Sequence, residues 1–336
     1  MTELDKTPGI VLIKTTYVHT LLGMLRDIDP DIYPYIEQAG LPENILNTPY
    51  DYIPDVPVRQ LIEIIAQKSS DAEYQNLCRQ ACKNIFIPTI IRQIKQARTV
   101  EQALLEFIEI MKTESPNSQI SVQSALGKTW FARYKAKSVN GAKWYELSEQ
   151  FAVIYMIELL RVITNTCWEP DILSLQSDEV TPFRTMLEDA DMTSSQIYTG
   201  RNFTALNLSD EILAKTFNRQ LSWQYQEQIV HQPKNFLESL KVALPTYLFA
   251  GKLPISKAAS VIGLSVRTLQ RRLKELDVSY RQILDEIQIN EAKKLLKNSN
   301  HPITAISTHL GYSNVAHFSR AFKRVTGEAP SIFRQH

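Results

Sequence analysis

Two stretches of the chain place side chains that can recognise nucleic acid on one face of an expected helix. In the first, residues 266–276, Leu269 and Leu273 recur four positions apart and are expected to face a core. The candidate contact residues of this stretch are Arg267, Thr268, Gln270, Arg271 and Lys274. Guanidinium and amide groups donate to base edges in the major groove, and cations bind backbone phosphates. The pattern therefore favours contact with double-stranded DNA.

The second stretch, residues 314–326, repeats this design. Its apolar stripe at helical spacing consists of Val315, Phe318, Phe322 and Val325. Opposite that stripe lie Ala316, His317, Arg320, Lys323 and Arg324. Arg271 and Arg320, at the middle of their helices, are the strongest candidates for a base or phosphate contact. Each such contact is expected to contribute about 1–3 kcal/mol.

A short helix and a turn are expected to precede each of these helices. Pro254 suits the start of the first short helix, Gly263 allows the positive φ needed to leave it, and Ser265 can cap the helix that follows. The second copy runs from Pro302 to a glycine at Gly311, 48 residues after the first turn glycine, with Ser313 or Asn314 as the cap. This spacing indicates an internal duplication of a helix-turn-helix.

Between the two copies, residues 280–297 contain no glycine or proline and predict one continuous helix. At 1.5 Å per residue, such a helix spans roughly 27 Å. With the width of the motifs added, the two recognition helices are expected to lie about 34 Å apart, one turn of B-DNA. Both could then enter successive major grooves on one face of the duplex.

The net charge of the chain is only +1, but its distribution is uneven. Residues 1–235 carry 22 Lys and Arg against 29 Asp and Glu, whereas residues 236–336 carry 15 against 7. A solvated basic surface would give the same imbalance, so charge alone does not decide. Together with the two duplicated motifs, the basic excess favours a polyanionic partner.

Residues 236–334 resemble the double helix-turn-helix domain of the AraC/XylS family of bacterial transcription regulators. The resemblance is carried by Gly311-Tyr312, the run from His317 to Lys323, Gly327, Pro330 and Phe333. It implies an all-α domain over residues 240–336, in which two helix-turn-helix motifs are joined by a long helix. It also implies that DNA is contacted by Arg267, Gln270, Arg271 and Lys274 in one groove, and by Asn314, Ala316, His317, Arg320 and Lys323 in the next.

Two residues depart from the family pattern. Gln288 stands where an arginine is common, four residues before Ala292, which puts one ion pair or phosphate contact in doubt. Ser307 replaces a usual alanine, a change expected to matter little because serine is also small.

Residues 1–229 predict an α+β domain, in which helices cover a small, mostly antiparallel sheet, and residues 230–239 predict a linker. The apolar period is helical from residue 16 to about residue 110. The segments expected to complete the domain are a hairpin over 119–126 and 129–137, a long helix over 143–165, the segment 171–176, a short helix over 182–190 and strands near 195–199 and 203–208.

The run from Ile197 to Phe203 and the helix start after Leu208 resemble the N-terminal domain called arabinose-binding-like in one AraC subgroup. The resemblance does not specify arabinose. It implies that the domain binds a small apolar or amphipathic effector, forms a homodimer, or does both. Candidate effector-binding residues are Trp130, Tyr134, Tyr145, Phe151 and Tyr155. A plain hydrophobic core explains the same aromatic clusters.

Other chemistry finds little support in the sequence. Cys78 and Cys82 lie four residues apart and could hold a metal or form a thiol switch, but with only Cys167 besides them, two core thiols are the simpler interpretation. No glycine-rich phosphate loop, GxSxG or HExxH motif occurs. We therefore expect no enzyme activity, metal or cofactor. The absence of a leader or a long apolar run predicts a cytoplasmic location without membrane contact.

The leading hypothesis is an effector-controlled transcription regulator, expected to be an activator, whose partners are promoter DNA and RNA polymerase. One alternative is an enzymatic or small-molecule-binding N-terminal domain that the C-terminal module recruits to DNA. Another is a regulator that needs no effector.

Overall fold

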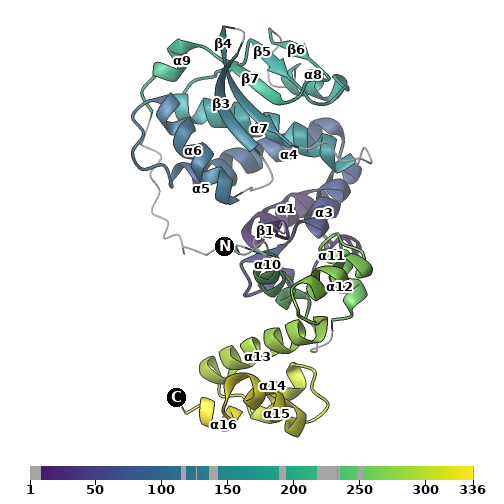
Figure 1. Ribbon diagram of the computed structural model, residues 1–336. Helices are drawn as coiled ribbons and strands as arrows, with labels where there is room; N and C mark the ends of the chain where they lie inside the picture. The colour runs from purple at the N-terminus through teal and green to yellow at the C-terminus, as the bar shows by residue number, and fades with distance from the viewer. Residues whose placement is uncertain are drawn as a thin grey trace. The chain divides into compact units, whose positions relative to one another are not determined.

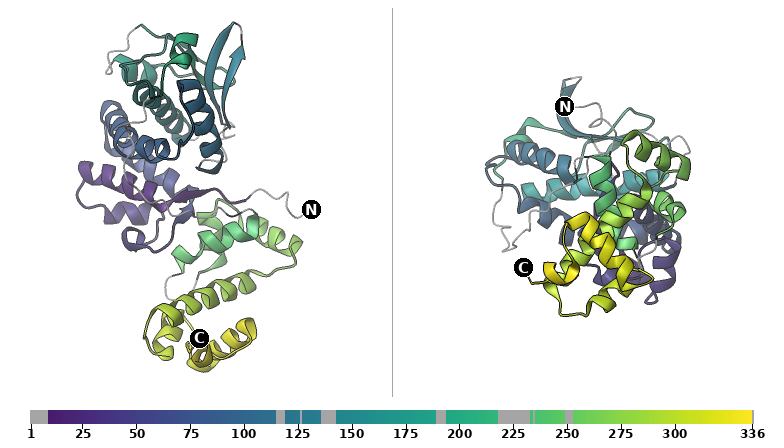
Figure 2. Two further views of the ribbon diagram at one scale, coloured as in Figure 1. Left: turned by 90° about the vertical axis from the view of Figure 1, so that its left-hand side faces the viewer. Right: turned by 60° about the horizontal axis from the view of Figure 1, so that its bottom comes forward.

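The computed structural model describes residues 9–114, 119–125, 127–135, 143–188, 194–217, 233, 235–248 and 253–335. The chain forms two compact units. Unit 1 consists of Met1–Thr16, Ile36–Val58 and His231–His336, and unit 2 of Tyr17–Tyr35 and Arg59–Val230. Figure 1 labels the elements, and Figure 2 shows them from two further directions. Within the described ranges, no helix is both long enough and apolar enough to cross a membrane.

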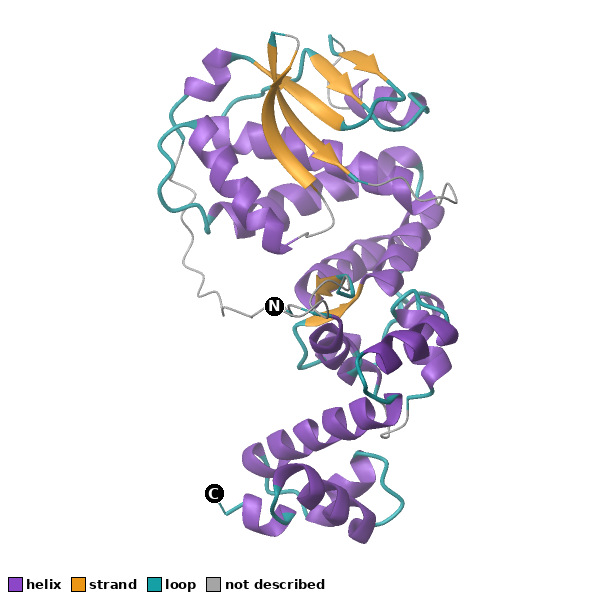
Figure 3. Cartoon of the chain, viewed as in Figure 1, coloured by secondary structure: helices purple, strands orange, loops and turns teal. Residues whose placement is uncertain are grey.

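Unit 2 contains a five-stranded sheet with the strand order β3-β4-β7-β5-β6 (Figure 3). Its strands are β3 (Gln119–Ala125), β4 (Lys128–Tyr134), β5 (Ile172–Ser174), β6 (Gln196–Tyr198) and β7 (Thr204–Leu208). All neighbours pair antiparallel except β5 and β6, which are parallel. The predicted hairpin is therefore present as β3 and β4. The ends of two predicted elements, residues 136–137 and 189–190, lie outside the described residues.

The helices of this region follow the predicted helical period. They are α1 (Thr15–Ile28), α2 (Tyr33–Gln38), α3 (Asp55–Lys68), α4 (Asp71–Ala81), α5 (Ile87–Ile91), α6 (Val100–Glu114), α7 (Lys143–Thr164), α8 (Thr181–Glu188) and α9 (Asp210–Ala214). A π-helical turn over Cys82–Phe86 separates α4 from α5. Helices α6 and α7 pack on one face of the sheet, where the Phe107 ring lies 5.9 Å from those of Phe131 and Tyr155.

Two carboxylates on α7 are buried in unit 2, and both have polar partners. Glu149 accepts hydrogen bonds from the backbone of Gln176 (2.7 Å) and Ser177 (3.0 Å), and from the hydroxyl of Thr204. Further along α7, Glu158 forms ion pairs with Arg79, Lys83 and Arg161, at 2.6, 3.3 and 3.4 Å. These contacts connect α7 to the loop after β5, to β7 and to α4.

Unit 1 includes two segments that the sequence alone assigned to the N-terminal domain. Strand β1 (Leu12–Lys14) pairs antiparallel with β2 (Tyr52–Pro54), which interrupts the region predicted as helical. Ile10 packs against the core that also contains Phe236 of α10 (Phe236–Ala243). The residues at 36–58 also include a 3-10 turn over Ile45–Asn47. Of the predicted linker at 230–239, residues 230–232 and 234 lie outside the described residues and 236–239 form the first half of α10, so the bounds of the linker stay a prediction.

The remaining elements of unit 1 build two small hydrophobic cores that share one helix. The elements are a 3-10 turn over Pro245–Tyr247, α11 (Ile255–Val261), α12 (Val266–Glu275), α13 (Tyr280–Asn298), α14 (Ile303–His309), α15 (Val315–Thr326) and α16 (Pro330–Phe333). Ile283 and Ile287 of α13 join the first core, with α10, α11 and α12. Ile289, Ala292 and Leu296 join the second core, with α14 and α15. The predicted long helix thus supports both motifs (Figure 2).

Gly263 marks a position where both backbone and packing require glycine. Its φ is +70°, and an added Cβ would lie 3.0 Å from Cγ2 of Val56. We expect Gly263→Ala to destabilise unit 1 by more than the roughly 1–2 kcal/mol cost of a left-handed alanine. Hydrogen exchange of α11 and α12 amides in the full chain would measure this loss.

Gly327 provides the matched control. It also has a positive φ, +87°, but nothing lies within 4 Å of an added Cβ. Gly327→Ala is therefore expected to cost the backbone term alone, and Val56→Ala should recover part of the Gly263→Ala loss. Equal costs at the two glycines would contradict a close approach of Val56.

Candidate nucleic-acid interface

The first helix-turn-helix consists of α11, the turn at Gly263 and α12. Ser265 caps α12 by accepting a hydrogen bond of 3.1 Å from the backbone N–H of Thr268. Leu269 and Leu273 are fully buried in the first core. The predicted cap, turn and inward face of this motif are all present.

The opposite face of α12 carries the predicted contact residues. Arg267, Gln270, Arg271 and Lys274 are exposed. Arg271 forms an exposed ion pair of 3.1 Å with Glu275, which is expected to hold it only weakly. Thr268 is half-buried and its hydroxyl lies 2.8 Å from that of Ser265, so it contributes to the cap as well as to this face.

The second motif consists of α14, the turn at Gly311 (φ +76°) and α15. Asn314 caps α15, its side-chain oxygen accepting from the N–H of His317 at 2.8 Å. Phe318 and Phe322 are fully buried. Val325, which the sequence placed in the same apolar stripe, is instead 41% exposed, because the second core ends before the last turn of α15.

The exposed face of α15 carries basic side chains and no carboxylate. Asn314, Ala316, His317, Arg320 and Lys323 are all exposed. The Nδ1 atom of His317 lies 3.3 Å from the Ser313 hydroxyl, and Nε of Arg320 lies 3.4 Å from the Ala316 carbonyl. Because these side chains are anchored only lightly, they can reorient toward base edges or phosphates.

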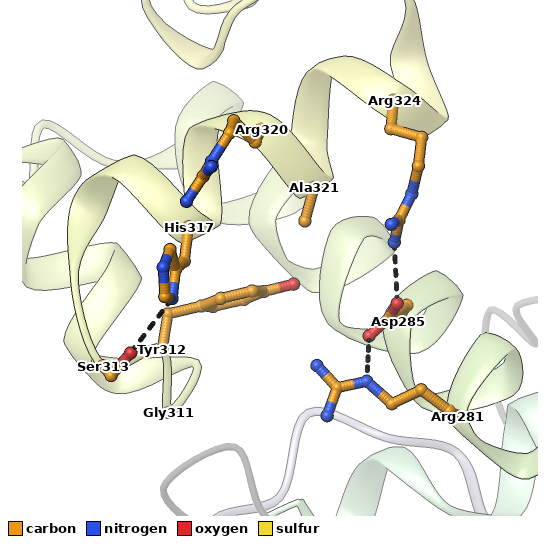
Figure 4. Close-up of a pocket in the computed structure, with 9 residues that line it drawn as sticks. All are labelled: Arg281, Asp285, Gly311, Tyr312, Ser313, His317, Arg320, Ala321 and Arg324. Atoms are coloured by element: carbon orange, nitrogen blue, oxygen red, sulfur yellow. Dashed lines mark hydrogen bonds and ion pairs between the residues drawn. The ribbon is translucent and has the colours of Figure 1, made fainter.

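A polar pocket of about 660 Å³ lies beside this face and includes residues that the sequence prediction missed (Figure 4). Its lining includes His317 and Arg320 of the predicted set, together with Arg281, Asp285, Tyr312 and Arg324. Asp285 forms ion pairs with Arg281 (3.0 Å) on its own helix and with Arg324 (2.8 Å) on α15. The sequence placed Arg324 on the polar face of the second recognition helix, but for Arg281 and Asp285 the signal was their four-residue spacing, which any exposed helix can show.

The two departures from the AraC/XylS pattern are both buried. The amide of Gln288 donates a hydrogen bond of 3.0 Å to the carbonyl of Leu310, at the end of α14. Gln288 therefore satisfies a helix-terminal carbonyl that would otherwise be buried without a donor. Ser307 of α14 is fully buried, and its hydroxyl has no hydrogen-bond partner.

The five candidate effector-binding residues do not gather at one place. Trp130 and Tyr134 lie on the sheet face opposite to Phe131, because side chains alternate along β4. On α7, Phe151 and Tyr155 pack together with ring centres 6.1 Å apart, within the aromatic core beside the sheet. Tyr145 is the third candidate on α7, and its hydroxyl donates a hydrogen bond of 3.2 Å to the Lys135 carbonyl. Phe151 and Tyr155 are half-buried, and an effector site at these residues stays a prediction.

The two neighbouring cysteines are buried thiols. Burial raises the pKa of Cys78 to about 12, and raises the pKa of Cys82 well above its usual value. A thiolate, which metal binding and thiol exchange require, is therefore disfavoured at both positions. Among the described residues, no group of three or more His, Cys, Asp or Glu side chains could hold a metal ion.

Comparison with known proteins places the two motifs in a family. A family model described as a helix-turn-helix domain matches residues 258–336. The HTH-type transcriptional regulator VqsM of Pseudomonas aeruginosa is 36% identical over 99 residues, which are 30% of this chain and 28% of that protein. The HTH-type transcriptional activator RhaS of Escherichia coli O157:H7 is 33% identical over 88 residues, 26% of this chain and 32% of that protein. The chain thus spans less than a third of these relatives.

Among solved structures, the transcriptional regulator CdpR from Pseudomonas aeruginosa aligns over 93% of this chain and 98% of its own. Its sequence identity is 19% and its TM-score 0.37, which is too low to establish a common fold. The family assignment therefore depends on the sequence matches to the C-terminal part. Those matches identify residues 258–336 as an AraC-type helix-turn-helix domain.

Proposed function

We propose that the protein is a sequence-specific DNA-binding transcription regulator rather than an enzyme. The observation that carries this proposal is the pair of capped helices α12 and α15, each with a buried apolar side and an exposed basic side. Side chains of this kind on a helix that fits the major groove can read base edges. Because one of the similar proteins is named an activator, we expect activation of transcription, with RNA polymerase as a further partner.

The shared helix α13 supports binding of both motifs to one DNA molecule. Its 19 residues correspond to about 28 Å of helix. Because both cores include side chains of α13, the spacing of the two recognition helices is fixed by a rigid element. We infer that α12 and α15 enter adjacent major grooves on the same face of the duplex, about 34 Å apart.

Binding sites selected by the full chain from random duplexes would test this proposal. Affinity for the selected site is expected to fall steeply over roughly 50–200 mM salt, since each neutralised phosphate contributes about 0.9 to the log–log slope. Two conserved half-sites about 10 base pairs apart are expected in the selected sequences. An affinity that ignores both salt and sequence would refute the proposal.

Arg320 is expected to contribute to sequence preference. Replacing it with alanine should reduce the preference for the selected site over random DNA by about 1–3 kcal/mol, because a base contact is lost while phosphate contacts remain. Competition binding with the two DNAs measures this preference. Arg184→Ala removes an exposed arginine from α8 in unit 2 and serves as the control. Equal effects of the two substitutions would contradict the assignment of Arg320.

We further propose that unit 2 binds a small apolar or amphipathic effector, forms the homodimer, or does both. The support is that unit 2 has its own core and sheet and carries none of the recognition helices. Native mass spectrometry of the freshly purified full chain would reveal both a retained ligand and the oligomeric state. A monomer that retains no ligand, and whose melting temperature no apolar or amphipathic compound raises, would favour an effector-independent regulator.

A further inference from the structure

The pocket beside α15 brings cationic side chains from two helices to one place. Arg281 comes from the first turn of α13, and Arg320 and Arg324 come from successive turns of α15. With Asp285 as the one carboxylate of its lining, the pocket has two more positive than negative charges. An excess of guanidinium groups around a concave surface favours an anion.

Asp285 forms ion pairs with two of these arginines and leaves most of their side-chain surface exposed to solvent. Its side chain is only 12% exposed, whereas those of Arg281 and Arg324 are 79% and 66% exposed. Each guanidinium therefore uses part of its fork on Asp285 and leaves its other N–H groups open to solvent. In Figure 4 the two arginines lie on opposite sides of the Asp285 carboxylate. The carboxylate thus fixes where the two cations stand.

The pocket also contains an unused donor. The hydroxyl of Tyr312 is buried and has no hydrogen-bond partner. In Figure 4 its ring extends along the pocket, with the hydroxyl end toward Ala321. Burial, and next the negative charge of Asp285, raise the pKa of Tyr312, so the hydroxyl keeps its proton. A buried donor without an acceptor is unfavourable, and an anion in the pocket would bring one close.

We propose that this pocket binds one phosphate group of the DNA backbone, with Arg281 and Arg324 as its ligands and Asp285 as the residue that positions them. The inference depends on the proposed function. A helix in the major groove has a phosphate backbone on either side of it, and His317 and Arg320 line both the pocket and the face assigned to the bases. DNA that meets Arg320 therefore passes directly over the pocket.

The test compares full-length variants on duplexes that each carry one neutral methylphosphonate. For the unmodified chain, neutralising one particular phosphate next to the second half-site is expected to lower affinity roughly tenfold, the loss of a charge-assisted pair. Arg324→Gln should cause a similar loss on unmodified DNA and be insensitive to that one methylphosphonate. Arg281→Gln should behave likewise, and Lys297→Gln, which removes an exposed charge from the far end of α13, should not.

Salt dependence supplies a second measure. Because both arginines bind the same phosphate, Arg281→Gln and Arg324→Gln should each reduce the slope of log affinity against log salt by about 0.9. The double variant should show the same reduction and not twice as much. Asp285→Asn separates positioning from simple charge balance. It should weaken binding severalfold if Asp285 positions the arginines, and strengthen binding if Asp285 only offsets their charge. Because Arg324 is exposed, its variant is expected to fold, and thermal unfolding would verify this.

Several outcomes would overturn the proposal. The first is that the unmodified chain and Arg324→Gln are equally sensitive to every methylphosphonate. The second is that the slope reductions of the two single variants add up in the double variant. The third is that Asp285→Asn binds DNA more tightly than the unmodified chain. Binding of inorganic phosphate that leaves DNA affinity unchanged would show a site for a free anion instead. If Arg320→Ala alters sequence preference while these results fail, only the pocket assignment is wrong. If no variant shows salt-dependent DNA binding, the proposed function itself is wrong.

Discussion

Replacing Phe322 with alanine is expected to unfold the second helix-turn-helix while leaving the first folded. Phe322 is fully buried, and its ring lies 5.7 Å from that of Phe318 and 5.3 Å from that of Phe333. A buried Phe→Ala change typically costs about 3–5 kcal/mol. Among the described residues, the second core has seven buried side chains, from Ile289 to Phe322, with five partly buried ones packed against them, so few contacts are left to compensate.

Hydrogen exchange of the full chain can separate the two motifs. Amides of α14 and α15 are expected to lose protection, whereas those of α11 and α12, which pack on a different face of α13, should keep it. Affinity for the selected DNA should fall by roughly 100-fold or more, since at least two contacts of about 1–3 kcal/mol each disappear with α15.

Val325→Ala is the matched control for this experiment. Val325 lies three residues further along the same helix and is 41% exposed, so its truncation is expected to change stability by no more than about 0.5 kcal/mol. Equal loss of protection in both motifs of the Phe322→Ala variant would show that the two cores unfold as one. The separate roles given to α12 and α15 would then need revision.

The two motifs could be predicted from the sequence because their determinants are local. Caps such as Ser265, turn glycines such as Gly263 and apolar positions three or four residues apart all act within one or two helical turns. The same holds for the hairpin of β3 and β4, where side chains alternate on either side of Gly127. Each of these signals is written in neighbouring residues, and the structure contains each element.

Contacts between distant residues could not be predicted in this way. The charge division at residue 235 placed residues 9–16 and 36–58 with the N-terminal part, yet they pack in unit 1 through β1, β2 and Ile10. The pairing of Asp285 with Arg324 joins positions 39 residues apart and has no local pattern. The scatter of the five candidate effector residues has the same cause, since aromatic composition does not reveal which face of a strand or helix a ring occupies.

Replacing Glu149 with leucine is expected to destabilise unit 2 by about 3–5 kcal/mol. The substitution removes the acceptor of the backbone N–H groups of Gln176 and Ser177 and of the Thr204 hydroxyl, and the hydrogen bonds to Gln176 and Thr204 are buried. It also leaves the buried Arg133 guanidinium without its compensating charge. Burial lowers the pKa of Arg133 and the negative charge of Glu149 opposes that shift, so the two side chains are electrostatically linked.

Hydrogen exchange of β5 and β7 amides in the full chain would measure this loss, because a chain of two units need not unfold in a single transition. Thr204→Val removes one hydrogen bond and keeps the shape of the side chain, so it is expected to cost only about 1 kcal/mol. The stability cost of Glu149→Gln should lie between these two costs. The amide oxygen can still accept a hydrogen bond, but the amide NH2 group then faces the backbone N–H of Ser177 or Gln176, so two donors oppose each other. The salt dependence of DNA binding is expected to be unchanged in Thr204→Val, since unit 1 carries both recognition helices.

A cost for Glu149→Leu as small as that for Thr204→Val would mean that water or a rearranged loop replaces the carboxylate, and that α7 and the sheet are held together by apolar packing alone.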